Sequence, residues 1–269
     1  MKREVKLVKK VKRLLKRLNC PRYLHHFGPK KYAFYQHFLA LLVKRVCRFS
    51  FRRACKFLEL LDIKVPSYSA LCKMRRRMPS KLWDALLQAT TKFKSYIVAV
   101  DSTGFSRTNP SWYFIKRIDR KKPIKSYVKL SSFFDTRRKK FLALRVRAKP
   151  RHDTKDITSL FRQRKNFKKL VGDSAYDAEF VHEKCFRLGI HAVIKPKKNV
   201  RKGFYRRKQR KNYHARTYGR RSMHESGFRS LKSKYGASLL GQSFSTQRAE
   251  LYCGALAHNM GLRCREIFN

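Results

Sequence analysis

The sequence contains few acidic residues and lacks the cysteine patterns of zinc-binding and disulfide-rich proteins. Asp and Glu together number 16 in a chain of 269 residues, and none of the seven cysteines belongs to a CxxC pair. Cys20 with His25 and His26 comes nearest to a metal cluster, but free thiols in a reducing cytosol are the simpler interpretation. We therefore expect neither a zinc knuckle nor a disulfide framework.

Long apolar runs are also missing. No stretch is long enough to form a transmembrane helix. Residues 1–18 carry apolar side chains only at interrupted spacing, unlike the continuous apolar region of a signal peptide. We expect no membrane partner.

The basic residues are the most abundant feature of the composition. Lys and Arg number 69, which gives a net charge of +53, while hydrophobic residues make up 42% and aromatic residues 13%. The apolar content argues against disorder, and a polyanion, most commonly nucleic acid, would neutralise the charge. Charge alone leaves open a ribosomal-type or packaging protein without catalytic chemistry.

The residue pattern of residues 1–95 predicts a helical region. Apolar residues follow a helical spacing on a basic first segment, and residues 31–49 predict a second, more apolar helix. Residues 51–63 and 67–78 predict two helices joined by a short turn, with Ser67 as N-cap. This pair resembles a DNA-binding helix-turn-helix, and an ordinary helical hairpin coated with arginine fits equally well.

Residues 96–269 predict an α/β fold with a mixed sheet flanked by helices. Strands are expected at 96–100, 111–118, 126–134, 140–148, 169–173 and 191–197, and helices near 154–165, 178–189, 220–235 and 246–265. Residues 197–221 are almost purely basic and aromatic and suggest a mobile loop. We expect Arg206, Arg207, Lys208 and Arg210 in this loop to bind DNA phosphates.

Two aspartates follow predicted strands. Asp101 comes directly after IVAV, and Asp173 comes after LVG. Ligands in α/β sheets bind at the carboxyl ends of strands, so both residues are candidates for a functional site. An aspartate in this position is also a common turn former or helix cap, and either residue alone does not decide between the two.

A third segment, residues 218–232, places one acid among three other polar residues. On a helix, Tyr218, Arg221, Glu225 and Lys232 would fall on one narrow face. Phe228, Leu231 and Tyr235 would form an apolar stripe beside it and pack on the sheet. A solvated polar face is the alternative, although it does not explain why one acid lies among bases.

The spacing Y-x2-R-x3-E-x6-K in this segment resembles the signature of DDE transposases of prokaryotic insertion sequences. The order VAVDSTG, VGDSAYD and then the glutamate helix is similar to that family, as is a C-terminal segment with Gln247, Glu250 and Asn259. The resemblance covers about residues 96–262 and is weaker at 50–78. His152–Asp153 resembles the family's His-Asp pair, and its role does not follow from the sequence.

The resemblance implies an RNase H-like catalytic domain with Asp101, Asp173 and Glu225 as catalytic triad. Two Mg²⁺ or Mn²⁺ ions per active site are expected on these carboxylates, because two-metal sites stabilise both the attacking and the leaving oxygen at phosphorus. Arg221 and Lys232 would hold phosphates, and Tyr218 would position a phosphate or stack on a base. The segment between Asp173 and Glu225 is short, so the large inserted β-domain of some relatives is absent.

The expected partner is double-stranded DNA, both at the terminal inverted repeats of a mobile element and at its target. A homodimer on DNA is expected, because two element ends must be paired. Two alternatives stay open: a catalytically inactive or domesticated DNA-binding protein, and an RNase H-like nuclease without strand transfer. Among the acids, Asp153, Asp177, Glu179 and Glu183 compete with Glu225 for the third place in the triad.

Overall fold

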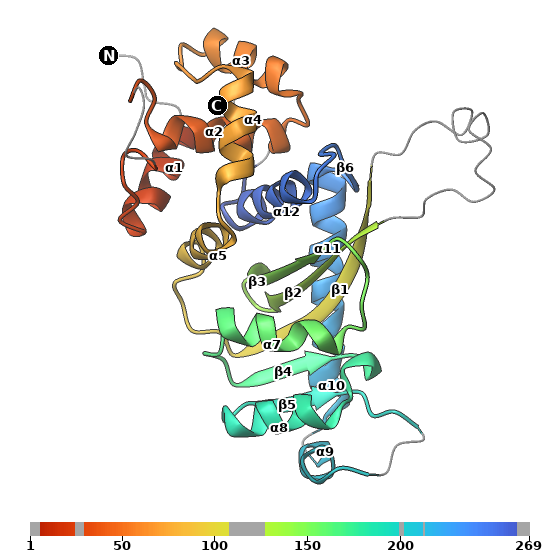
Figure 1. Cartoon of the computed structure of the whole chain (residues 1–269). Helices are drawn as coiled ribbons and strands as arrows, with labels where there is room; N and C mark the ends of the chain where they lie inside the picture. The colour runs from red at the N-terminus through yellow and green to blue at the C-terminus, as the bar shows by residue number, and fades with distance from the viewer. Residues whose placement is uncertain (1–5, 25–29, 108–126, 199–201, 212, 263–269) are drawn as a thin grey trace, which may run out of the picture. The chain divides into compact units, whose positions relative to one another are not determined.

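The computed structural model describes residues 6–24, 30–107, 127–198, 202–211 and 213–262 (Figure 1). The chain forms two compact units. The first contains Met1–Lys92, Ser230–Gly236 and Arg248–Asn269, and the second contains Phe93–Arg229 and Ala237–Gln247. The N-terminal stretch of the first unit ends at Lys92, and this unit also takes in two segments from the last part of the chain. Among the described residues, no helix is long and apolar enough to cross a membrane.

The first unit is helical. In α1 (Lys6–Arg17), Leu7, Val11 and Leu14 are buried while Lys9 is exposed, so the spacing predicted an amphipathic helix correctly. The remaining helices of this unit are α2 (Phe34–Val46), α3 (Phe51–Leu60), α4 (Tyr68–Arg77), α5 (Ser80–Ala89) and most of α12 (Phe244–Asn259).

The α3–α4 pair is capped at the predicted residue. The side chain of Ser67 accepts a hydrogen bond from the backbone nitrogen of Ala70, which satisfies one of the free donors at the start of α4. Arg76 and Arg77 on α4 are exposed, whereas Arg75 is half-buried. A basic second helix is therefore present, as either a helix-turn-helix or a helical hairpin requires.

A buried ionic network joins three helices of the first unit. Glu250 on α12 is 3% exposed and lies 3.2 Å from the Lys44 Nζ on α2 and 3.3 Å from a guanidinium nitrogen of Arg75 on α4. Arg45 contributes a third cation at 3.7 Å. Because a buried charge is costly unless it is paired, Glu250 and its cations stabilise one another.

The second unit contains a mixed sheet of six strands in the described part of the chain. Its order is β3-β2-β1-β4-β5, and β6 pairs with the far end of β1. The first three strands, β1 (Ile97–Arg107), β2 (Tyr127–Asp135) and β3 (Lys140–Arg147), are antiparallel. The parallel strands are β4 (Lys169–Gly172), β5 (His191–Ile194) and β6 (Ser238–Leu239).

Helices cover both faces of this sheet (Figure 1). On one face, Phe133 and Val98 pack in a core with residues of α7 (Thr154–Gln163) and α8 (Glu179–Arg187). On the other face, Phe134 packs against the first half of α11 (Ser222–Tyr235). The predicted α/β class with a mixed sheet flanked by helices is confirmed.

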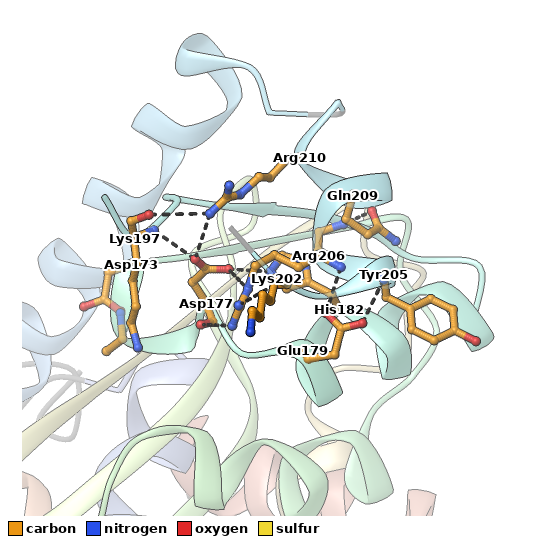
Figure 2. Close-up of polar contacts among 12 residues, drawn as sticks. Asp173, Asp177, Glu179, His182, Lys197, Lys202, Tyr205, Arg206, Gln209 and Arg210 are labelled. Atoms are coloured by element: carbon orange, nitrogen blue, oxygen red, sulfur yellow. Dashed lines mark hydrogen bonds and ion pairs between the residues drawn. The ribbon is translucent and has the colours of Figure 1, made fainter. Parts of the chain in front are cut away.

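The basic segment near the end of this unit is helical rather than a loop. It forms α9 (Phe204–Arg210), α10 (Ala215–Tyr218) and a 3-10 turn at Gly219–Arg221. Asp177 accepts a hydrogen bond from the Nε of Arg206 at 3.0 Å and another from the backbone nitrogen of Lys197 at 2.8 Å. Both contacts are drawn in Figure 2. Sequence analysis missed this because Arg206 looks like any other basic residue until its acidic partner is known.

Two expectations lie outside the described residues. The strand expected at 111–118 is one, and the His25–His26 part of the weak metal cluster is the other.

Candidate active site

The register of the sheet brings Asp101 and Asp173 together. Ala99 of β1 is paired with Val171 of β4, so two residues further along each strand Asp101 and Asp173 lie at the same level. Neighbouring strands are about 4.8 Å apart. The sequence predicted Asp101 at the end of a strand, but β1 continues to Arg107. The parallel partner β4 does end at this level, at Gly172. On this side of β1, the described strands pair with it only at Ile97–Ala99 and at Ser106–Arg107, so Asp101 lies between the two paired stretches.

Arg221 connects two of the three predicted catalytic acids. Its guanidinium lies 3.4 Å from the Asp101 carboxylate and forms an ion pair with Glu225. Arg221 ends the 3-10 turn and Glu225 lies in the first turn of α11, so they are one helical turn apart. The side chain of Glu225 is 53% exposed and that of Asp101 is 16% exposed, so the site opens to solvent.

The signature residues do not lie on one continuous helix. Tyr218 ends α10, where its ring lies 5.7 Å from that of Tyr213. Lys232 lies two turns beyond Glu225 on α11, in the part of that helix that belongs to the first unit. The predicted apolar stripe divides in the same way: Phe228 packs on Phe141 of the sheet, while Tyr235 donates to the Leu262 carbonyl of the first unit.

The environment of Asp101 favours its protonated form. The pKa of Asp101 is raised to about 6, mainly by burial and also by the nearby charges of Asp173 and Glu225. The backbone N–H of Ser102 and the guanidinium of Arg221 act in the opposite direction by stabilising the carboxylate. Acids that repel one another in this way are expected to attract a cation.

The donor set suits a hard divalent cation. Three carboxylates offer only oxygen atoms, the ligands that Mg²⁺ and Mn²⁺ prefer. Within the described ranges, the structure contains no group of three or more acidic, histidine or cysteine side chains close enough together to hold a metal ion. The guanidinium of Arg221 instead supplies the positive charge between Asp101 and Glu225.

A buried histidine fixes the helix that carries Glu225. His224 is fully buried, and its Nε2 forms a 2.7 Å hydrogen bond with the hydroxyl of Ser132, the residue paired with Asp101 across the sheet. Its ring stacks on Phe134 and Phe228. Burial, and to a smaller extent the charge of Arg221, lower the pKa of His224 to about 3, so the imidazole is neutral. The sequence does not reveal the role of His224, because its partner Ser132 lies 92 positions away.

The His152–Asp153 pair also lies near Asp101. The Ser102 hydroxyl donates to the Asp153 carboxylate at 2.6 Å, and Lys129 forms an ion pair with the same carboxylate. Asp153 therefore holds the residue that follows Asp101 in β1. His152 is exposed and bonds to the Thr154 hydroxyl. A positioning role for Asp153 follows from these contacts, which the sequence did not reveal.

The other acids that competed with Glu225 have partners of their own. Glu179 accepts from the backbone nitrogens of Tyr205 and Arg206 at the start of α9. Glu183 pairs with Arg187 on the surface of α8. Asp177 is buried among basic groups. None of them is paired with Arg221, which contacts Asp101 and Glu225.

The basic residues of α9 differ in exposure. Arg207 and Lys208 are exposed and Arg210 is partly exposed, while Arg206 is 9% exposed and paired with Asp177. Three of the four predicted phosphate contacts are thus accessible to solvent. The guanidinium of Arg206 is engaged in holding α9 in place.

Comparison of the chain with known proteins identifies the family to which it belongs. The model of the transposase DDE domain matches residues 92–260, which is more than half of the chain. No curated protein matches the chain. Among solved structures, the chain is similar to the piggyBac transposase in a synaptic complex with hairpin DNA, at 10% identity and a TM-score of 0.48, over 94% of this chain and 71% of that one. By the family match, the protein belongs to the DDE transposase family.

Proposed function

We propose that this transposase binds the ends of its own mobile element and catalyses metal-dependent DNA strand cleavage and strand transfer into target DNA. One observation carries the proposal: Arg221 holds Asp101 and Glu225 together where the register of the sheet also aligns Asp173. These are the acidic residues of the family signature, and the chain belongs to that family.

Asp101, Asp173 and Glu225 would hold the metal. DDE transposases use divalent metal ions, and two Mg²⁺ or Mn²⁺ ions in such a site supply charge stabilisation to the attacking and leaving oxygens of phosphoryl transfer. The positions of the three acids in the family signature, and the preference of these ions for oxygen ligands, support this ligand set. His224 and Asp153 would position the elements that carry the acids, through Ser132 and Ser102.

Arg221 would exchange partners during the reaction. In the DNA-free protein its guanidinium neutralises Asp101 and Glu225. When cations take over that role, the freed guanidinium would bind a DNA phosphate through paired hydrogen bonds. Tyr218 and Lys232 would bind neighbouring phosphates or bases.

Charge supports double-stranded DNA as partner. The net charge of +53 favours a polyanion, and exposed basic residues occur on α4 of the helical unit and on α9 of the sheet unit. We assign recognition of the terminal repeats to the helical unit and phosphate contacts to Arg207, Lys208 and Arg210. Pairing of two element ends would require a homodimer on DNA.

The proposal is tested with short duplexes that carry the element's own ends, a supercoiled target and Mg²⁺. We expect both cleaved ends and products joined to the target, and Asp101→Asn should form neither. Cleavage without joining would favour the nuclease alternative. Tight binding without either product, in Mg²⁺ and in Mn²⁺, would favour a DNA-binding protein without catalysis.

A further inference from the structure

An exposed cluster of aromatic rings and a lysine lies on α8 and α9, on the sheet unit. We name it the α8–α9 platform: Phe186, Phe204, Tyr205 and Lys208. Phe204 is 61% exposed and Phe186 is 41% exposed. Tyr205 lies 5.4 Å from the ring of Phe186 and 5.1 Å from that of Phe204. Rings of this size are usually covered, so exposed ones in a cluster indicate a binding surface.

The lysine of the platform lies over the rings. The Lys208 Nζ is 4.3 Å from the centre of the Phe186 ring and 5.8 Å from that of Phe204. Within the described part of the chain it contacts these rings and no carboxylate. Next to the rings, a groove of about 380 Å³ is lined by Phe186, Lys208 and Lys211 among others. Cations and aromatic faces therefore alternate on one surface.

Helical spacing separates this surface from the face that holds α9 in place. Phe204, Lys208 and Lys211 follow one another at intervals of four and three residues, which places them on one face of the helix. Arg206 and Gln209 are buried on another face. The amide of Gln209 bonds to the backbone of Ala192 and Ile190 beside β5.

Acidic side chains fix α9 at its start. Figure 2 shows Glu179 beside Tyr205 and Arg206, whose backbone nitrogens donate to its carboxylate at 2.8 and 3.1 Å. Asp177 binds the Arg206 side chain from the same turn that follows Asp173. Seven residues would not stay helical alone. These contacts hold the platform in a set position on the unit that carries Asp173.

We propose that the α8–α9 platform binds unpaired nucleotides of the DNA strand, with bases stacked on Phe204 and Phe186 and phosphates on Lys208 and Lys211. This inference rests on the proposed function, because it takes DNA as the substrate. Base stacking on aromatic residues needs a free base face, which single strands offer and intact duplexes do not. Lys208 over the rings and Lys211 in the adjacent groove match the charge of phosphates better than the apolar surface of a second copy would.

The test compares a short single strand with the duplex of the same sequence, by fluorescence anisotropy without metal. Phe204→Ala should weaken binding of the single strand at least about fivefold and binding of the duplex less than about twofold. The slope of log Kd against log salt should not change, because no charge is removed. Phe204→Leu should behave like Phe204→Ala, since leucine has no ring to stack on.

Tyr96→Ala is the matched control. Tyr96 is 60% exposed, and Lys169 lies over its ring at 5.8 Å, but it stands outside the platform. This variant should bind the single strand as the wild type does. In the wild type, 2-aminopurine in the single strand should lose fluorescence on binding, and in Phe204→Ala this quenching should diminish.

Several results would overturn the proposal: unchanged single-strand affinity in Phe204→Ala, equal losses for strand and duplex, or wild-type affinity in Phe204→Leu. If Phe204→Ala changed the oligomeric state measured by sedimentation and left single-strand binding intact, the platform would be a contact between copies of the chain. That result would also refute the proposal. A different result would refute the transposase proposal: the wild type would form no cleaved or joined products, while single-strand binding and its dependence on Phe204 would be observed as expected.

Discussion

The guanidinium of Arg221 lies 3.4 Å from the carboxylate of Asp101, although 120 residues separate them in the sequence. The same guanidinium pairs with Glu225. One basic residue therefore occupies the place of a cation between two acids that the proposed mechanism assigns to metal.

The first prediction follows from this competition. Arg221→Gln should raise the affinity for Mn²⁺ in the absence of DNA by about fivefold, or about 1 kcal/mol, because a partly exposed fixed cation no longer competes. Strand cleavage should fall by about 10²-fold, since a charge that stabilises phosphate is lost. Calorimetry with Mn²⁺ and a single-turnover cleavage assay measure the two effects. Arg220→Gln, on the exposed neighbour, should change neither; weaker Mn²⁺ binding by Arg221→Gln would refute the exchange.

The second prediction concerns the third catalytic acid. Glu225→Gln preserves the shape of the side chain but removes a negative charge, so cleavage and joining should fall by orders of magnitude. DNA affinity should be equal or slightly higher because a repulsive charge is gone. Glu183→Gln changes a partly exposed acid paired with Arg187 and should stay active. If only Glu183→Gln were inactive, the choice of Glu225 would be wrong.

The third prediction separates the buried from the exposed basic residues of α9. Arg206→Ala removes the guanidinium that donates to buried Asp177 and should lower the free energy of unfolding by about 3–5 kcal/mol. Arg207→Ala should lie within about 0.5 kcal/mol of the wild type. Urea unfolding of both variants tests this, and equal stability would mean that α9 is not held by the Asp177 contacts.

The fourth prediction is a dependence of stability on pH. The folded-state pKa of His224 is lowered from 6.5 to about 3, so the unfolded chain binds a proton near neutral pH that the folded protein does not. Stability due to His224 is thus fully present above pH 6.5 and is lost as the pH falls toward 3. Between pH 6.5 and 5 the loss should be about 1.5 kcal/mol.

His224→Gln removes this titration while keeping a side chain that can bond to Ser132. The variant should lose less stability than the wild type over the same pH range in urea unfolding. Identical losses in the two proteins would show that His224 does not titrate in this way.

The fifth prediction concerns the helical unit. Glu250→Gln leaves Lys44, Arg45 and Arg75 without their shared acid and should lower the free energy of unfolding by about 3–5 kcal/mol. Glu59→Gln, an exposed glutamate on α3, should have an effect below about 0.5 kcal/mol. A thermal melt monitored by circular dichroism is sufficient, and matching midpoints for the two variants would contradict the prediction.

Local patterns in the sequence determined much of the architecture. Helical spacing of apolar residues predicted α1, and the Ser67 side chain caps α4 as expected. The hairpin of β2 and β3 was also predictable, and so was the end of α8 just before Gly189. The alternation of apolar and polar residues, the turn residues and the glycine each act over a few neighbouring residues. The spacing of Tyr218, Arg221, Glu225 and Lys232, with the two aspartate segments before it, indicated the family that the family model confirms.

Only the tertiary structure decided what the charged residues do. Nothing near Arg206 in the sequence distinguishes it from Arg207, yet one is buried against Asp177, 29 positions away, and the other is exposed. Likewise, Arg221 meets Asp101 because the 3-10 turn that carries Arg221 packs against β1 and β4. The physical reason is the same in each case: secondary structure follows from local spacing, whereas the burial and pairing of a charge depend on groups that folding brings together from distant parts of the chain.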